Sequence, residues 1–392
     1  MNLSDGIAKY IPKLIEIRRD IHAHPELRYE ENRTGDVVAA ALAKMGLAVH
    51  RGLGKTGVVG TLTRGKKLGA IGLRADMDAL PVLEGNLFSH ASKYKNIMHA
   101  CGHDGHTTML LGGAMLLADD PTFDGTAHFI FQPAEEGGAG AKAMMDDGLF
   151  TQFPMDAVFG LHNWPLLPAG QFAVCVGPIM SAANRFEIRV EGRGAHAAQP
   201  HTGVDPIPII CAMVGQLQLL ISRNLNPVDA AVLTIGQIVA GTTENIIPSH
   251  AIMKGTLRTL SAATLAIMQA GMQRICEYTA LAHNATATLT FIEGYPATVN
   301  HAAETQFAGD VIASLVGEGA LNRDTPPNMT AEDFGFMLEA RPGCYALIGN
   351  GGGNGTSSCN NLHNPNYDFN DDIIGLGASY WAQLSRQWFA KK

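Results

Sequence analysis

Apolar residues in the first 180 positions follow two different spacings. Ile7, Ile11 and Leu14 recur at helical intervals, whereas runs such as GVVGTLT and TAHFIF are short and continuous, as in buried strands. The two kinds of segment alternate, which predicts an α/β fold with a mixed, mostly parallel sheet and helices on both faces. The expected helices are 5–23, 34–46, 104–118 and 139–147, and the expected strands are 57–63, 69–74, 126–131 and 157–161.

The segment from about 183 to 293 has a different order of elements. The order of strands and helices is β-α-β-β-α-β, which is that of a ferredoxin-like unit. Its expected elements are strand 184–191, helix 205–222, strands 230–239 and 251–258, helix 262–282 and strand 285–292. Helix 302–317, strand 344–348 and helix 371–389 then resume the first pattern. The sequence therefore predicts one domain made of residues 1–182 and 294–392, with a second domain, residues 183–293, inserted into it.

Composition narrows the class of protein. A chain of 392 residues is longer than a domain with a single hydrophobic core usually is, which agrees with two domains. The 28 basic and 36 acidic residues give a net charge of −8 without a basic block, so no nucleic-acid or membrane-surface partner is expected. No run approaches about 18 apolar residues, and the N-terminus lacks an apolar signal core, so we expect no membrane span. Six cysteines at irregular spacing predict reduced thiols and a cytoplasmic protein.

Metal-type side chains follow several of the expected strands. Ligands of an open α/β sheet bind outside the carboxyl ends of its strands, so these side chains should converge on one rim. No single cluster establishes a metal site, but several clusters at the ends of neighbouring strands together predict one. The residues are Asp76 and Asp78 after strand 69–74, Cys101, His103, Asp104 and His106 at the start of helix 104–118, Glu135 and Glu136 after strand 126–131, His162 after strand 157–161, and His363 after strand 344–348.

Two of these clusters have a structural as well as a chemical explanation. Cys101-Gly-His103 offers a thiolate and an imidazole, which are good ligands for zinc-like ions, but it also fits a buried cysteine beside a capping histidine. Glu135 and Glu136 fit a solvated turn. Beside a metal, one of these carboxylates can ligate while the other acts as a base.

Single histidines carry less information. Taken alone, His162 in GLHN fits a satisfied core residue, and His363 in NNLHNP fits a surface residue. The histidines without a ligand-type partner in a strand-end motif are interpreted as surface or packing residues, and they are His22, His24, His50, His90, His128, His250, His283 and His301.

Five motifs, in order, resemble one known family. They are MHACGHDGHT (98–107), QPAEEGG (132–138), GLHN (160–163), GRGAHAAQPH (192–201) and LHNP (362–365). The sequence resembles the M20 metallopeptidase family, and the cysteine of HACGHD resembles its amidohydrolase branch. That branch includes hippurate hydrolases, bacterial aminoacylases and plant hydrolases of indole-acetyl amino acids. The resemblance runs from about residue 18 to the last helix.

The resemblance implies a catalytic domain with two divalent metal ions per chain, for which manganese, zinc, cobalt and nickel are chemically acceptable. It implies Glu135 as the general base. Asp78 matches the position that orients a ligand, although Asp76-Met-Asp78 replaces the wider family's His-x-Asp. The implied metal ligands are Cys101, His103, Glu136, His162 and His363, with Cys101 as the bridge.

The resemblance also implies that the inserted domain is a lid that mediates dimerisation. His196 would donate to the developing oxyanion from the partner subunit. Asn245 and Arg258 would hold the substrate carboxylate, which suits a guanidinium; without the resemblance, they fit a turn residue and a surface charge. An exposed edge strand and a long apolar helix also favour pairing across a two-fold axis, so we expect a homodimer, or a tetramer that contains it.

Three functions compete. The first is hydrolysis of the amide bond of a small-molecule N-acyl amino acid, such as an N-acetyl or N-benzoyl amino acid. The second is a dipeptidase or carboxypeptidase on the same scaffold. The third is a metal-binding relative without activity, which would require a lost ligand or base, whereas every expected position is filled. The sequence therefore favours the amidohydrolase, and it does not identify the acyl group.

Overall fold

The computed structural model describes residues 6–351 and 360–391, and the chain divides into two compact units. The first unit comprises Met1–Ile179, Val299–Pro326 and Asp333–Lys392, and the second comprises Met180–Thr298 and Pro327–Glu332. The sequence predicts an inserted domain of residues 183–293, and the main divisions between the two units fall after Ile179 and after Thr298. The grouping of the short stretch 327–332 with the second unit has no counterpart in the apolar pattern.

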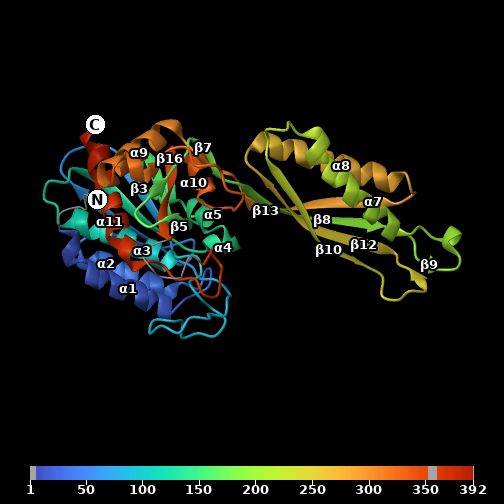
Figure 1. Ribbon diagram of the computed structural model, residues 1–392, viewed down its shortest axis with the longest axis horizontal. Helices are drawn as coiled ribbons and strands as arrows, with labels where there is room; N and C mark the ends of the chain where they lie inside the picture. Colours follow the sequence, from blue (N-terminus) through green and yellow to red (C-terminus); the bar gives the residue numbers. More distant parts are fainter. Residues whose placement is uncertain (1–5, 352–359, 392) are drawn as a thin grey trace. The chain divides into compact units, whose positions relative to one another are not determined.

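A mixed sheet forms the centre of the first unit (Figure 1). Its strand order is β1-β2-β4-β3-β5-β16-β6-β15. The central strands β4, β3, β5 and β16 are parallel neighbours, whereas β1, β2 and β4 pair in antiparallel fashion. The predicted fold class is therefore confirmed. The strands are β1 (Ala48–Leu53), β2 (Gly57–Arg64), β3 (Ala70–Asp76), β4 (Gly125–Gln132), β5 (Ala157–Pro168), β6 (Phe172–Ala173), β15 (Leu321–Asn322) and β16 (Gly343–Gly351).

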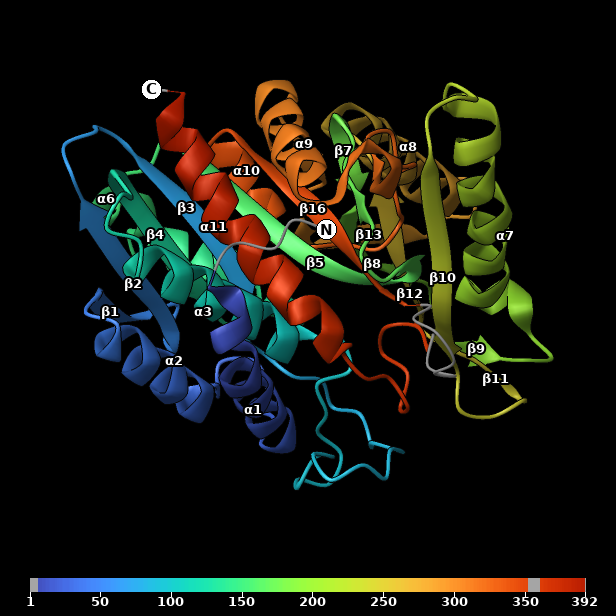
Figure 2. The ribbon, with the colours of Figure 1, turned by 60° about the vertical axis from the view of Figure 1, so that its left-hand side comes forward.

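Helices cover both faces of this sheet, and Figure 2 shows α11 crossing in front of it. α3 is buried on nearly all sides, and after its polar first turns it is apolar around its circumference from residue 109 to 118, as is typical of a central helix. Gly113 of α3 lies against Trp381 of α11, and a Cβ on this glycine would come within 2.5 Å of the tryptophan Cβ, so the glycine lets the helices approach closely. The helices are α1 (Ile11–Ala23), α2 (Asn32–Lys44), α3 (His103–Ala118), α5 (Gly140–Asp146), α6 (Leu149–Gln152), α9 (Ala302–Val316), α10 (Gly335–Ala340) and α11 (Ile374–Ala390).

The second unit has the predicted ferredoxin-like order. Its sheet runs β10-β12-β8-β13, and every neighbouring pair is antiparallel. Two helices lie on one face of this sheet (Figure 1), and the core between them and the sheet includes Phe186, Ile210 and Met272. The elements are β8 (Ala182–Glu191), α7 (Pro206–Leu219), β10 (Ala231–Ala240), β12 (His250–Thr259), α8 (Ala262–Leu281) and β13 (Thr286–Tyr295).

One helix among the described residues, Pro206–Asn224, is long and apolar enough to span a membrane by length and composition alone. It consists of α7 and the π-helical turn Leu220–Asn224. Its residues Ile209, Met213 and Leu217 are buried in the core of the second unit. Packing against the core of the second unit therefore explains why this side of the helix is apolar.

Several differences from the expected elements lie at exposed or very short strands, and the expected helix 5–23 is a 3-10 turn, Ile7–Lys9, followed by α1. The apolar pattern does not reveal β1, because most of its residues are exposed or half-buried, nor β6 and β15, which have two residues each. β5 continues to Pro168, beyond the expected end at residue 161. The Gly-rich run 349–355 begins inside β16, and its residues 352–355, like Cys359, lie outside the described residues.

Candidate metal centre

The carboxyl ends of the central strands carry the predicted site residues. β3 ends at Asp76, and His162 lies in β5. Glu135 begins the short helix α4 (Glu135–Gly138) just after β4, and His103 begins α3. His363 lies in the segment between β16 and α11. The polar clusters thus follow neighbouring strands of one sheet.

Ligand-type atoms of these residues form one connected cluster. Three groups have their candidate atoms within 4.8 Å of one another, and they are Cys101, Glu136 and His363; His103, Glu135 and Glu136; and Asp76, His103, His106 and His162. Because Glu136 and His103 each belong to two groups, the groups are contiguous. The structure therefore brings together Glu135 and all of the residues predicted as metal ligands.

A tight turn explains the Cys-Gly-His spacing. Gly102 has a φ of 89°, in the left-handed region that favours glycine. A Cβ at this position would lie 2.3 Å from Nδ2 of Asn163 and 2.5 Å from the hydroxyl of Tyr367. Glycine is therefore required both by the backbone and by the space. The turn places Cys101 and His103 in the same cluster.

Asp78 ties two parts of the cluster together. Its carboxylate accepts hydrogen bonds from the main-chain N–H of Glu135 at 3.0 Å and of Glu136 at 2.9 Å. Its Oδ1 also lies 3.3 Å from Nδ1 of His103. Ala134, just before the glutamate pair, has a φ of 54°, a conformation that costs a non-glycine residue about 1–3 kcal/mol and is typical of functional sites. The bonds to Asp78 help to hold this strained turn.

Two ligand-type atoms of the cluster are buried and have no hydrogen-bond partner among the described residues. They are Nε2 of His103 and Oε1 of Glu136. Nε2 of His363 lies 3.2 Å from that glutamate oxygen, but their geometry is not that of a hydrogen bond. Burying such atoms unpaired is costly. Thiolate, imidazole and carboxylate together suit divalent transition metals, so the residues present fit a metal site.

Carboxylates dominate the electrostatics of the cluster. Burial lowers the pKa of His103, but Asp76 and Asp78 outweigh burial and raise this pKa to about 10. Burial and the carboxylate of Glu136 raise the pKa of the Cys101 thiol well above its usual value. The cluster thus favours added positive charge. A divalent cation would reverse the effect on Cys101, because a coordinating thiol loses its proton.

Three further buried residues lie at the rim, and the sequence assigns none of them as a ligand or as a base. His106 lies next to Asp76, and Asn163 contacts both His106 and Tyr367. The motifs HDGH and GLHN contain His106 and Asn163, so the sequence gives a weak indication that these two residues belong to the site. The sequence gives no such indication for Tyr367, because its partner Asn163 is 204 positions away in the chain.

The interpretation of His22 as a surface or packing residue needs correction. This side chain is fully buried, its Nδ1 lies 2.8 Å from Oδ2 of Asp104, and its Nε2 lies 3.2 Å from Oε1 of Glu84. Burial lowers its pKa, but Asp104 outweighs burial and raises the pKa to about 9. His22 is therefore an ion-pairing residue. The aspartate lies 82 positions away, so the local sequence cannot reveal the pair.

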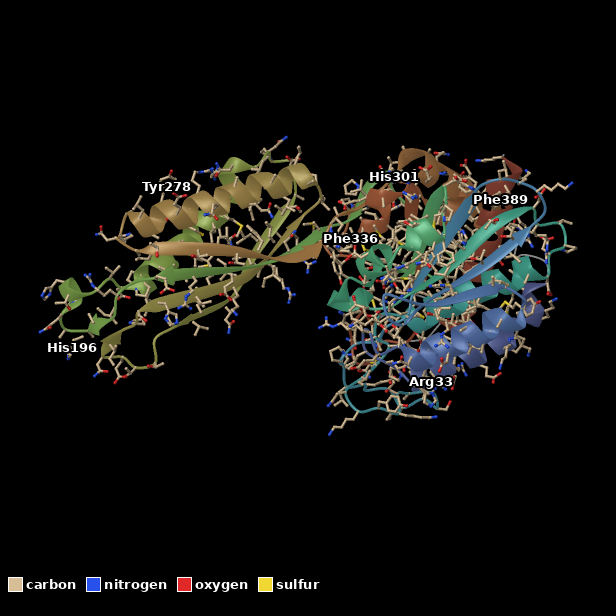
Figure 3. The ribbon with its side chains drawn as sticks, turned by 180° about the vertical axis from the view of Figure 1, so that it is seen from behind. Arg33, His196, Tyr278, His301, Phe336 and Phe389 are labelled. Atoms are coloured by element: carbon tan, nitrogen blue, oxygen red, sulfur yellow. The ribbon has the colours of Figure 1, made fainter. Side chains whose placement is uncertain are left out.

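The predicted lid residues occupy two ends of the second unit. His196 lies in β9 (Ala195–His196), at one tip of this unit (Figure 3), and the main-chain carbonyl of Asn245 accepts a hydrogen bond from the N–H of Ala197 at 3.1 Å. Arg258 pairs with Ala183, near the opposite end of β12. Eight residues separate Arg258 from the start of β12, or about 26 Å of extended strand. One copy of the second unit therefore cannot present Asn245 and Arg258 to the same small carboxylate.

Similarity to known proteins covers almost the whole chain. It is 40% identical to a hippurate hydrolase from Campylobacter jejuni over 388 residues, which cover 99% of this chain and 100% of that protein. It is 39% identical to thermostable carboxypeptidase 1 from Saccharolobus solfataricus over 379 residues, covering 95% of this chain and 94% of that protein. The first of these relatives is named as a hydrolase of hippurate and the second as a carboxypeptidase.

A solved structure shares the fold. A crystal structure from Bacillus subtilis, described as a dinuclear metal binding peptidase from the M20 family, matches with a TM-score of 0.85 and 32% identity, covering 98% of this chain and 100% of that one. The match of this chain to peptidase family M20/M25/M40 spans residues 72–387, a range that includes every predicted site residue. The chain therefore belongs to peptidase family M20/M25/M40, and within it to the amidohydrolase branch.

Proposed function

We propose that this amidohydrolase cleaves the amide bond of N-acyl amino acids and releases a carboxylic acid and a free amino acid. The observation that carries the proposal is the cluster of thiol, imidazole and carboxylate groups beside Glu135, in which two buried ligand-type atoms have no hydrogen-bond partner within residues 6–351 and 360–391. The similarity to a hippurate hydrolase, over the full length of both chains, supports an acyl group on the amino-acid nitrogen.

The proposed cofactors are two divalent metal ions per chain, drawn from manganese, zinc, cobalt and nickel. Such ions would supply Lewis acidity, which polarises an amide carbonyl and makes water a better nucleophile near neutral pH. The residues that would hold them are Cys101, His103, Glu136, His162 and His363. Asp78 would orient His103 through Nδ1, leaving Nε2 of the ring for the metal.

The two glutamates would divide the work. Glu136 belongs to the group of ligand-type atoms that contains Cys101 and also to the group that contains His103. This shared position suits the role of a metal ligand. Oε1 of Glu135 accepts the main-chain N–H of Asp333 at 3.4 Å, a contact that orients the carboxylate without using it as a ligand. Glu135 would take a proton from the attacking water and pass it to the leaving amine nitrogen, as a general base and then a general acid.

We propose that the second unit is a lid that pairs two chains into a homodimer, or into a tetramer of such dimers. β10 is an edge strand whose Val232, Ile238 and Val239 are 42%, 43% and 51% exposed. An edge strand with exposed apolar side chains is a ready surface for pairing with a second copy. Nothing in this arrangement calls for a nucleic-acid or membrane partner.

The lid residues would act on the substrate within this dimer. Nδ1 of His196 accepts a hydrogen bond from the N–H of Ala198 at 3.0 Å, so the neutral ring carries its proton on Nε2 and can donate it to a developing oxyanion. Asn245 and Arg258 would bind the substrate carboxylate. Because they lie at opposite ends of one lid, their joint contact with one substrate requires both chains of the dimer.

The cysteines fit a reducing compartment, and we propose the cytoplasm. Each cysteine in the described part of the chain is a free thiol, and Cys101 is buried. A bridging thiolate would be lost on oxidation, so a reducing environment would protect the site.

A carboxypeptidase acting on peptides is the alternative, and the similarity to a thermostable carboxypeptidase favours it. A substrate panel separates the two, using hippurate, N-acetyl amino acids, an indole-acetyl amino acid and simple dipeptides, with Glu135→Gln as the blank. We expect the highest kcat/KM on an N-acyl amino acid. A preference for dipeptides would support the alternative.

A further inference from the structure

Asn163 follows His162 in β5, and its side chain is fully buried. A buried amide costs free energy unless its polar atoms find partners. Here Nδ2 donates to the carbonyl oxygen of Cys101 at 2.6 Å, and Oδ1 accepts the hydroxyl hydrogen of Tyr367 at 2.8 Å. The side chain therefore joins the Cys101 turn to the segment that follows β16.

The main chain of Asn163 fixes the orientation of two histidine rings. Its carbonyl oxygen accepts a hydrogen bond from Nδ1 of His162 at 2.6 Å, so the lone pair of the neutral ring lies on Nε2, which is 3.5 Å from Sγ of Cys101. Its N–H donates to Nε2 of His106 at 2.9 Å. The proton of His106 therefore lies on Nδ1, which donates to Oδ1 of Asp76 at 2.6 Å. Both nitrogens of His106 are occupied, so this ring supports the site without being a ligand.

Tyr367 extends the link to the last predicted ligand. It lies four residues after His363, whose N–H donates to the carbonyl oxygen of Ala100 at 2.7 Å. The Tyr367 ring is buried, and its hydroxyl lies 2.5 Å from the place that a Cβ on Gly102 would take. The hydroxyl thus fastens the His363 segment to Asn163 and to the Cys-Gly-His turn.

We propose that Asn163 is a positioning residue that holds Cys101, His162 and the His363 segment in the geometry needed for two metal ions, with Tyr367 as its anchor. The inference rests on the dinuclear site proposed above. Residues that orient metal ligands are commonly worth about 10–100-fold in metal affinity. The bond from the tyrosine hydroxyl can be removed without changing the shape of either ring.

The test compares two Tyr→Phe variants by zinc competition against a chromogenic chelator. Tyr367→Phe removes the bond to Asn163. Tyr380→Phe is the matched control, because this tyrosine is also fully buried and its hydroxyl has no hydrogen-bond partner among the described residues. Thermal unfolding of each metal-free variant in excess chelator measures any general loss of stability separately.

Tyr367→Phe should weaken the binding of at least one zinc ion by about 10-fold, and Asn163→Ala should weaken it further, whereas Tyr380→Phe should match the wild type. Equal zinc affinities for the two Tyr→Phe variants, with two ions bound to the wild type, would overturn this inference and leave the proposed site intact. A wild-type chain that takes up no metal would contradict the proposed site itself. If Asn163→Ala does not fold, the pair of tyrosine variants still decides the question.

Discussion

Arg18 donates a hydrogen bond from Nε to Oδ1 of Asp371 at 2.6 Å, across 353 positions of the chain. The guanidinium is 1% exposed and also bonds to Asp368 at 3.0 Å and to the carbonyl oxygen of Phe369 at 3.0 Å. A single buried cation on α1 thus holds the segment that runs from His363 to α11.

Replacement of Arg18 should therefore destabilise the fold. Arg18→Met leaves Asp368 and Asp371 without their buried partner, and removing one member of such a pair typically costs about 3–5 kcal/mol. Arg19→Met is the matched control, because Arg19 binds the other oxygen of Asp371 but its side chain is 48% exposed, where a pair is worth about 0–1 kcal/mol. Urea unfolding measures both. Equal losses of unfolding free energy would show that the buried position of Arg18 does not matter.

His22 should make stability fall on the alkaline side. Its pKa is about 9 in the folded chain and about 6.5 when unfolded, so its ion pair with Asp104 stabilises the fold fully below pH about 6.5. That contribution is lost as the pH rises through about 9. The difference in unfolding free energy between wild type and His22→Gln, measured without metal, should shrink from pH about 6 to about 10. His283→Gln, at an exposed position, is the control, and a constant difference for His22→Gln would refute the assignment.

Two isosteric substitutions should distinguish the role of Glu135 from that of Glu136. Glu135→Gln should retain both metal ions and lose about 10²–10⁴-fold in kcat, because it removes proton transfer and keeps the ligands. Glu136→Gln should lose metal instead. Metal analysis and steady-state kinetics on the same preparations measure both effects. Swapped behaviour of the two variants would mean that the roles of base and ligand are assigned in reverse.

Mixed dimers test whether His196 acts across the dimer. A Glu135→Gln chain and a His196→Ala chain should each be inactive alone. In a heterodimer, the site on the His196→Ala chain has its own Glu135 and receives His196 from the partner's lid, so part of the activity should return. Mixing two differently tagged Glu135→Gln chains is the control. Confirmed heterodimers without recovered activity would place His196 within its own chain, or outside catalysis.

The fold was largely predictable because long segments with clear apolar spacing bury one face. The strand 184–191 and helix 262–282 correspond closely to β8 and α8, since alternation and helical periodicity are strong there. β1 is different, because its exposed residues carry no burial pattern. β9 is two residues long and is defined by its pairing with β11 (Ile246–Ile247), and no local sequence pattern reveals such a pairing.

The site was predictable as far as strand ends determine it. Parallel neighbours bring the ends of β3, β4 and β5 together, so residues such as His103 and Glu136 cluster without any knowledge of side-chain contacts. The residues that orient them were not predictable, because their partners are distant in sequence. Asn163 and Tyr367 meet across 204 positions, and this contact depends on the packing of a loop.

Metal stoichiometry measured together with activity tests the central claim most directly. Protein purified without chelator should contain about two divalent ions per chain, lose hydrolysis of hippurate or an N-acetyl amino acid when they are removed by dialysis against a chelator, and recover it when manganese, zinc, cobalt or nickel is restored. Full activity in protein without stoichiometric metal would contradict the account.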